Sequence, residues 1–284
     1  MKFSRFQAAS NECWIMYKKW LKKWRSYRYR FFPWIAFNLR NRTVREVSSS
    51  DQDKIIPDSK VIENLITVFH TLHGNQESGY DHAQSPGQRE TFPEAMYNAL
   101  GFEIKRQEST IPGAGKGVIV TKGTVPIGTL VALYPGTIYW PNEPVLFQSI
   151  GNPFVFRCVD GIIIDGNDKG LSRIIYRSNA RRDQIGPYSL CDTTWLGSEP
   201  QNPLAVGQYV NNRPKTLPAN VAYQEVDIPF RTIAPNLWKY LPNVWYGSGN
   251  IASENCFLRT VALVSVRDIT QDEELFSSYF TVIH

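Results

Sequence analysis

The chain has 284 residues, of which 42% are hydrophobic and 20% charged, and its formal net charge is +5. This length and apolar fraction suit one large folded domain, with or without an appendage, and exclude collagen-like and wholly disordered chains. The longest apolar run, residues 31–37, is interrupted by Pro33 and is far shorter than the roughly 18 residues of a membrane span. No secretory signal pattern follows a basic start, so we expect an intracellular protein.

The charge is unevenly distributed along the chain. Residues 1–45, called the leader below, contain 12 Lys or Arg and one acidic residue, Glu12, whereas the remainder has 19 basic and 25 acidic residues. The overall positive charge therefore describes a basic leader joined to a mildly acidic body.

Steps of three and four in the leader predict an amphipathic helix that ends near Pro33. Its predicted stripe consists of Trp14, Tyr17, Leu21, Trp24, Arg28 and Phe31. Three interpretations stay open. The stripe docks on the main domain, or the leader contacts an anionic membrane or directs the chain to an organelle, or its aromatic and basic side chains bind nucleic acid.

The cysteines give no sign of a metal site. The four cysteines, Cys13, Cys158, Cys191 and Cys256, are far apart and form no C-x-x-C pair. We therefore expect buried free thiols, with no structural zinc, no bound metal and no disulfide framework.

The rest of the chain predicts helices followed by short strands. Residues 46–101 contain a polar linker at 47–57, a helix from about Ser59 to a stop at Gly74, an exposed loop at 75–92 and a helix over 93–100. From Gly101 onward, β-branched and aromatic runs alternate with Gly, Pro and Asn turns. Strands are predicted over 117–121, 129–135, 153–158, 161–165 and 260–266. The expected fold class is α+β, mostly β.

The sequence GAGKGV at 113–118 resembles two phosphate-binding motifs without matching either. A P-loop needs Gly where Thr110 stands, and Ser or Thr where Gly117 stands. A dinucleotide-binding turn needs a following helix, whereas VIVT predicts a strand. Taken alone, these glycines indicate a tight turn.

Three segments in chain order nevertheless resemble the SET-domain family of protein lysine methyltransferases. The first has Gly115, Lys116 and Gly117, then Gly128, then the YPG sequence at 134–136. The second has Tyr209, Val210, Asn211 and Asn212, with Asn220 further on. The third, Glu273, Glu274, Leu275, Ser278 and Tyr279, lies in DEELFSSYF.

The resemblance covers about residues 102–280. It implies a SET domain, a β-clip of short curved sheets with knot-like C-terminal threading, which contains an insert at 140–206 and is preceded by a helical N-terminal region. Residues 281–284 would form a short tail.

The resemblance also implies roles for the matched residues. S-adenosylmethionine would bind at Gly115, Lys116, Gly117, Tyr209, Asn211, Asn212 and Tyr279. Asn211 would hold the amino-acid end of the cofactor through its side chain, and the Asn212 backbone would meet the adenine. Tyr279 would be the catalytic residue, placed beside the methyl group and the amine of a lysine-containing protein substrate.

The match departs from the family pattern at several positions. Asn212 replaces the family's His, Ser278 its Asp, and the Pro-Asn pair becomes Pro218-Ala219-Asn220. Ser277 stands where the family often has Phe or Tyr, which would leave room for higher methylation. No cysteine-rich zinc-binding tail follows Tyr279, so the insert or the leader would have to cover the site.

Two functional classes follow. The first is an active S-adenosylmethionine-dependent protein-lysine methyltransferase. The alternative is a catalytically weak or inactive SET fold that serves as a peptide-binding or scaffolding module. The resemblance suggests the nucleus, while the acid-poor leader permits the mitochondrion.

Overall fold

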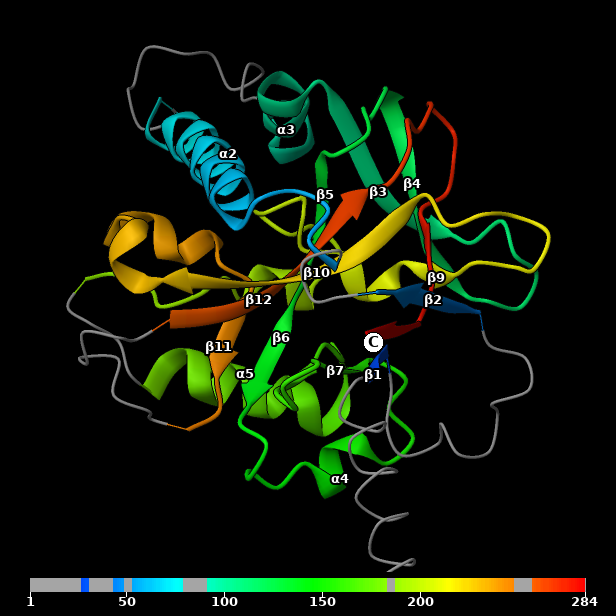
Figure 1. Ribbon diagram of the computed structural model, residues 1–284. Coiled ribbons are helices and arrows are strands. Elements are labelled where there is room, and N and C mark those ends of the chain that lie inside the picture. Colours follow the sequence, from blue (N-terminus) through cyan, green and yellow to red (C-terminus); the bar gives the residue numbers. More distant parts are fainter. Residues whose placement is uncertain are drawn as a thin grey trace, which may run out of the picture.

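The computed structural model describes residues 27–30, 43–48, 53–78, 91–182, 187–247 and 257–283 (Figure 1). Within these ranges the strands form one large sheet and three small ones. The seven-stranded sheet has the order β11 (Asn243–Trp245), β6 (Gly136–Tyr139), β8 (Ile163–Asp165), β7 (Val155–Arg157), β1 (Tyr27–Arg30), β14 (Phe280–Ile283) and β2 (Val44–Val47).

The small sheets carry the remaining strands. One has the order β10 (Val221–Pro229), β12 (Phe257–Ser265) and β5 (Leu130–Tyr134). The other two pair β3 (Phe102–Glu108) with β4 (Lys116–Gly123), and β9 (Asn211–Asn212) with β13 (Phe276–Ser277). The α-helices in the described ranges are α2 (Asp58–Ser78), α3 (Phe92–Leu100), α4 (Leu146–Ser149) and α5 (Gly170–Arg182). Short 3-10 turns cover Thr194–Leu196, η5 at Gly207–Tyr209, Phe230–Thr232 and Pro235–Tyr240.

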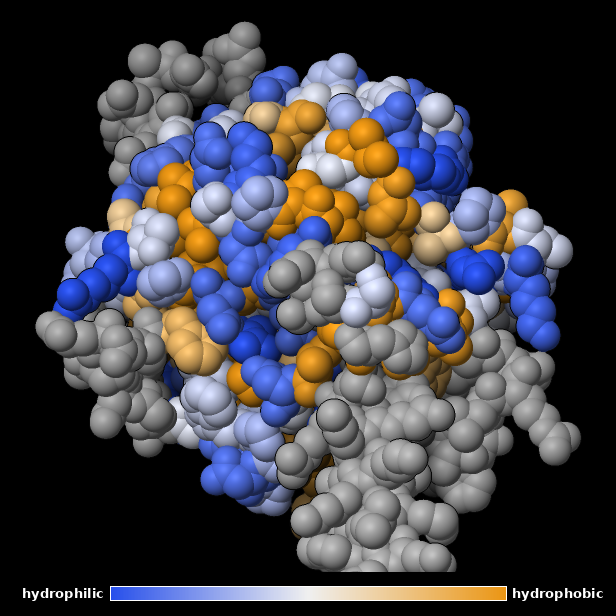
Figure 2. Space-filling view, in the orientation of Figure 1, coloured by the Kyte–Doolittle hydropathy of each residue, from blue (hydrophilic) through white to orange (hydrophobic). Residues whose placement is uncertain are grey.

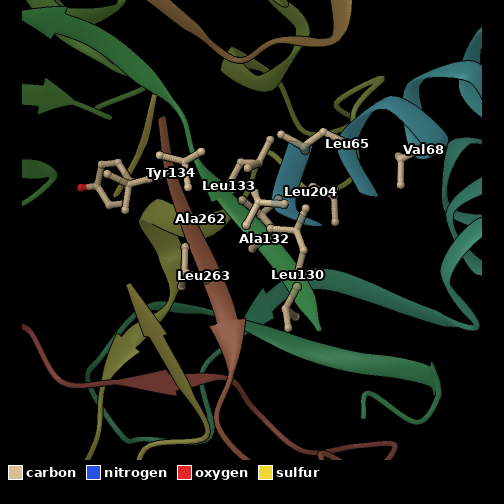
Figure 3. Packing of buried hydrophobic residues seen from close by; sticks show 14 of the residues in the cluster. Leu65, Val68, Leu130, Ala132, Leu133, Tyr134, Leu204, Ala262 and Leu263 are labelled. Carbon is tan, nitrogen blue, oxygen red and sulfur yellow. The ribbon is translucent and has the colours of Figure 1, made fainter. Parts of the chain in front are cut away.

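The core lies between the three-stranded sheet and the two N-terminal helices. All five residues of β5 are buried, and they pack with Leu65 and Val68 of α2 and with Leu204 (Figure 3). A strand buried on both faces reads as a continuous apolar run, as LVALY does. In Figure 2 hydrophobic residues show between the polar side chains around α2, α3 and the strands beneath them, where partly buried apolar side chains border the core.

The predicted strands are confirmed in position, each with shifted ends, and the helix at 93–100 is confirmed as α3. Thr91 forms a capping box with Glu94, and Gly101 ends the helix with φ +80°. These are the start and stop signals expected for a short helix.

The predicted stop of the first helix at Gly74 is wrong, because α2 continues to Ser78. A glycine inside a helix costs about 1 kcal/mol relative to alanine. Tertiary contacts at the last turns offset this cost: Gln76 Oε1 accepts hydrogen bonds from Lys239 Nζ at 2.6 Å and Tyr240 Oη at 2.9 Å.

Part of the leader belongs to the large sheet. Residues 27–30 form β1 between β7 and β14, so the predicted helix is wrong over these residues, and its other positions lie outside the described residues. The sequence YRYR alternates with a period of two, which is a strand pattern. Likewise β2 pairs in parallel with β14, and β14 continues to Ile283, beyond the predicted domain end at 280.

Helix α5 was not predicted from the sequence. Its buried side carries Ser172, Tyr176, Asn179 and Ala180, so the apolar period that would announce a surface helix is absent. Among the helices of the described ranges, none has the length and apolarity needed to cross a bilayer.

Candidate functional site

The structure brings the three sequence segments together at one place. The Asn211 side chain on β9 donates from Nδ2 to the carbonyl oxygen of Lys116 at 3.0 Å. Strand β9 pairs in parallel with β13, with Asn211 opposite Phe276 and Asn212 opposite Ser277. Tyr279 follows β13 by two residues, and its hydroxyl donates to the carbonyl of Val210 at 3.4 Å. The Lys116 backbone, the Asn211 amide and the Tyr279 phenol therefore share one neighbourhood.

A buried carboxylate, Glu274, holds these segments in place. Its Oε1 accepts from Asn211 Nδ2 at 3.0 Å and from Ser109 Oγ at 2.8 Å. Its Oε2 accepts from the Thr110 backbone N–H at 2.7 Å and from the Thr110 hydroxyl. Glu274 is 4% exposed, so four hydrogen bonds satisfy a charge that would be costly to bury alone. We call Glu274, Ser109, Thr110 and Asn211 the Glu274 clasp.

The two glycines of the first motif have different surroundings. A Cβ at Gly117 would overlap the Glu274 carboxylate, lying 2.8 Å from its Cδ, so the clasp requires glycine there. Gly115 has φ +74°, and a Cβ there would meet no atom within 4 Å. Gly117 therefore belongs to the internal packing, whereas Gly115 borders open space.

The side chain of Asn212 positions the backbone at Tyr279. Its Oδ1 accepts from the Tyr279 backbone N–H at 3.1 Å and from the Thr43 hydroxyl at 2.8 Å. Thr43 is 6% exposed and directly precedes β2. The N-terminal strand β2 is thus connected to the segment that carries the predicted catalytic tyrosine.

The Tyr209 side chain has different partners. Its hydroxyl donates to Asp168 Oδ2 at 2.6 Å, and the Arg106 guanidinium lies 4.7 Å from its ring centre. Burial, followed by the hydrogen bond to Asp168, raises the pKa of Tyr209 well above its usual value. No described hydrogen bond joins this hydroxyl to Lys116, Asn211 or Tyr279, although Tyr209 precedes Asn211 by two residues.

Ser277 lies in an aromatic environment. It is fully buried, and its hydroxyl donates to the Tyr223 hydroxyl at 2.9 Å. The Tyr223 ring contacts Phe156 and Tyr134, with ring centres 5.0 and 6.4 Å away. The volume that a small serine was expected to leave open is therefore bordered by Tyr223.

Asn220 ties the C-terminal segment to the second motif. Its Oδ1 accepts from the Phe276 backbone N–H at 2.7 Å, and its Nδ2 donates to the Glu274 carbonyl at 2.8 Å. Its own backbone N–H donates to the Phe276 carbonyl at 3.0 Å. The longer spacing after Pro218 still delivers Asn220 to the segment 274–276.

Among the described residues, one group has metal-ligand chemistry: Cys158, Asp160 and Glu225, whose ligand atoms lie within 4.8 Å of one another. The Arg259 guanidinium is placed here, 2.8 Å from Asp160 and 3.2 Å from Glu225, and it also bonds Asp227 at 2.6 Å. An internal cation already balances these carboxylates, so we interpret the group as an ion-pair cluster.

The two acidic residues of the third motif, Glu273 and Glu274, could not be assigned different roles from the sequence. Glu273 points to Arg267, whose hydrogen bond lowers the pKa of Glu273 to about 2, while Glu274 forms the clasp. Successive side chains in extended backbone face opposite sides, which assigns the two acids to different surroundings. Thr43 and Asp168 carried no sequence signal, because their partners are 169 and 41 residues away.

Comparison with known proteins gives two close relatives. The chain is 46% identical over 294 residues to SET domain-containing protein 9 of Homo sapiens, covering 92% of this chain and 96% of the relative. It is 44% identical over 271 residues to SET domain-containing protein 9 of Pongo abelii, covering 85% and 97%. No family model matches the chain.

Two similar solved structures are much more distant. "ctPRC2 in an autoinhibited conformation bound to S-adenosylmethionine" has a TM-score of 0.35 and 12% identity, and the match covers 66% of this chain and 16% of that one. A humanized mutant of the Chaetomium thermophilum Polycomb Repressive Complex 2 bound to an inhibitor has a TM-score of 0.34 and 15% identity, covering 72% and 18%. Likeness at this level carries no argument.

The two relatives settle the family. Identity above 40% extends over nearly the whole length of both relatives. The expected SET domain, in an α+β and mostly β chain, is confirmed. This chain belongs to the family of SET domain-containing protein 9.

Proposed function

We propose that the chain is an S-adenosylmethionine-dependent methyltransferase that acts on a protein lysine side chain. The observation that carries this proposal is the meeting of three segments: the Asn211 amide bonds both the Lys116 carbonyl and the buried Glu274 carboxylate, and the Tyr279 phenol bonds the adjacent Val210 carbonyl. These three segments are up to 163 positions apart in the sequence. A glycine turn that only reversed the chain locally would not require the Asn211 and Tyr279 segments to lie beside it.

The residues present fit the amino-acid end of the cofactor. The side of Gly115 that would carry a Cβ is open, so the backbone of the first motif is approachable there. Asn211 uses Nδ2 for Lys116 and Glu274, and its Oδ1 has no hydrogen-bond partner among the described residues. That oxygen would accept from an ammonium group, while the Asn212 backbone would meet the adenine.

When bound, the cofactor supplies a methyl group on a positively charged sulfur. The protein's task is then to align a neutral amine with that group and to exclude water. A lysine amine has an ordinary pKa of about 10.4, and a desolvated aromatic channel lowers it by disfavouring the charged form. The buried rings of Tyr134, Phe156 and Tyr223 supply apolar, aromatic surroundings beside Ser277.

Tyr279 would orient the amine through its hydroxyl oxygen. Its backbone is held by the Asn212 side chain, and its hydroxyl donates to the Val210 carbonyl, so the hydroxyl oxygen would act toward the amine as an acceptor. This is a positioning and polarising role, in which no proton is removed by a strong base.

Thermal unfolding of the full chain with S-adenosylmethionine tests the cofactor, and transfer of radiolabelled methyl to protein in a cell extract tests the activity. A ligand at 100 times its dissociation constant stabilises the folded state by about 2.7 kcal/mol. We expect Tyr279→Phe to keep the thermal shift and to lose at least tenfold in transfer rate. Tyr188→Phe, at an exposed tyrosine, is the matched control.

Two results would contradict the proposal. Absence of a thermal shift at millimolar S-adenosylmethionine would favour the scaffolding alternative. Methyl transfer that is lost after protease treatment of the extract identifies a protein substrate, and acid hydrolysis of the product must then yield methyl-lysine; methyl groups on another side chain would refute the lysine assignment.

A further inference from the structure

Helix α5 exposes both large apolar and basic side chains on its outward side. Leu171 and Ile174 are 47% and 66% exposed, whereas Ser172 and Asn179 are both 4% exposed. At 100° per residue, Leu171 and Ile174 lie on one side of the helix and Ser172 and Asn179 on the other. Tyr176 and Ala180 on the inward side pack in a hydrophobic cluster, so Leu171 and Ile174 are not needed to hold the helix on the body. The outward side of α5 therefore carries two large apolar side chains that stay exposed in the described part of the chain.

Helix α4 also exposes large apolar side chains. Leu146, Phe147 and Ile150 are 66%, 73% and 63% exposed, although large apolar side chains usually avoid such positions. Asn152, just after α4, donates to Ser172 Oγ at 3.4 Å and to Asp165 Oδ1 at 2.7 Å, which places the end of α4 beside the first turn of α5. Both helices lie in the lower part of the molecule in Figure 1.

Basic side chains border the same surface. Residues 169–182 contain one lysine and four arginines and no acidic residue. Lys169, Arg177 and Arg181 are exposed and form no ion pair among the described residues. Arg173 and Arg182 instead donate to the carbonyls of Leu196 at 2.8 Å and Tyr246 at 2.9 Å. The α4–α5 face comprises Leu146, Phe147, Ile150, Lys169, Leu171, Ile174, Arg177 and Arg181.

We infer that the α4–α5 face docks on an anionic lipid surface. Exposed apolar side chains on α4 and α5, together with exposed cations on and next to α5, match a bilayer interface, which accepts both at once. A nucleic acid would explain the arginines and leave the five exposed apolar side chains without a role. The two features together therefore favour lipid.

The leader strengthens this inference. It carries 12 basic residues and one acidic residue, and its residues Tyr27–Arg30 form β1, which pairs with β7. Strand β7 begins six residues after α4 ends. The leader strand β1 is therefore the direct neighbour of the strand that follows α4. Stable peripheral binding usually needs two signals, and a polybasic segment with an apolar insertion supplies both.

Co-sedimentation of the full chain with vesicles tests the inference. We expect binding to phosphatidylcholine vesicles that contain phosphatidylserine, and at least tenfold weaker binding to phosphatidylcholine alone. Phe147→Ser combined with Ile174→Ser removes apolar area and lowers the partition coefficient about tenfold. Arg177→Gln and Arg181→Gln each lower it about fivefold.

Ile127→Ser and Lys60→Gln, at exposed positions before β5 and on α2, are the matched controls and leave the partition unchanged. Equal thermal midpoints for all variants show that folding is intact. The inference is overturned if the face variants bind vesicles like the unchanged chain, or if no anionic vesicle is bound. It is also overturned if the arginine variants weaken binding to duplex DNA and leave vesicle binding unaltered.

Discussion

At the residue scale, a single amide oxygen connects the N-terminal strands to the predicted catalytic tyrosine. Asn212 Oδ1 accepts from both the Thr43 hydroxyl and the Tyr279 backbone N–H. We expect loss of the Thr43 bond to weaken the hold on the Asn212 carboxamide, and with it the position of the Tyr279 backbone. Thr43 is therefore a positioning residue that touches no reacting atom.

Thr43→Val tests this connection, since valine keeps the shape and removes the hydroxyl. If the proposed activity holds, we expect kcat to fall about tenfold with little change in the KM for S-adenosylmethionine, and thermal stability to fall by about 1 kcal/mol. Thr43→Ser restores the hydroxyl and should recover kcat.

Thr121→Val is the matched control, because it removes a comparable hydrogen bond to Glu103 on the β3–β4 sheet, 2.9 Å long. An equal loss of kcat in both valine variants would mean that stability alone explains the effect.

At the element scale, the β3–β4 hairpin and the segment before β13 are locked by the Glu274 clasp. The loop between β3 and β4 supplies Ser109 and Thr110, and the backbone of Leu275 donates to the Val118 carbonyl at 2.8 Å. A short loop with little apolar burial gains its definite shape from these polar bonds. The sequence motif therefore marks a structural lock as well as a candidate binding turn.

Separate alanine substitutions at Gly117 and Gly115 distinguish the structural role of this segment from its role as a candidate binding turn. Gly117→Ala displaces the Glu274 carboxylate and should lower the free energy of unfolding by about 2–4 kcal/mol. Gly115→Ala meets open space and incurs only the strain of a positive φ, about 1–2 kcal/mol. Urea denaturation measures both values; a larger loss for Gly115→Ala would contradict the clasp.

At the scale of the whole molecule, two buried carboxylates oppose folding at neutral pH. Asp165 on β8 accepts from Asn152 and from the Asn167 backbone, while its Oδ2 has no partner within the described chain. Burial raises its pKa to about 6, and burial does the same for Asp192. A folded-state pKa above the unfolded value of 3.8 means that stability is lost as pH rises between about 4 and 6.

Asp165→Asn removes this titration. We expect the variant to be more stable than the unchanged chain at pH 7, by about 1–3 kcal/mol, with the difference shrinking toward pH 4, where the native aspartic acid is protonated. Chemical denaturation at both pH values measures it, and Asp268→Asn at an exposed position is the control. A difference that does not depend on pH would refute the assignment.

The sequence alone determined the elements whose signals are local. The LVALY strand, the Thr91 capping box and the Gly101 stop need only neighbouring residues, because hydrophobic period and capping act within a few positions. The chemical roles of the three motif segments could also be predicted. The backbone freedom of glycine, the hydrogen-bonding groups of the asparagine amide and the phenol of tyrosine are properties of the residues themselves.

The tertiary structure decided what depends on distant partners. Residues 27–30 became a strand because β7 and β14 offer unpaired backbone groups on both sides, and α2 passed Gly74 because Lys239 and Tyr240 hold Gln76. Helix α5 escaped prediction because its buried side includes the polar Ser172 and Asn179 and its exposed side includes Leu171 and Ile174, so no clear hydrophobic period marks it. The Glu274 clasp unites positions up to 165 residues apart, and only the folded chain brings such groups within hydrogen-bonding distance.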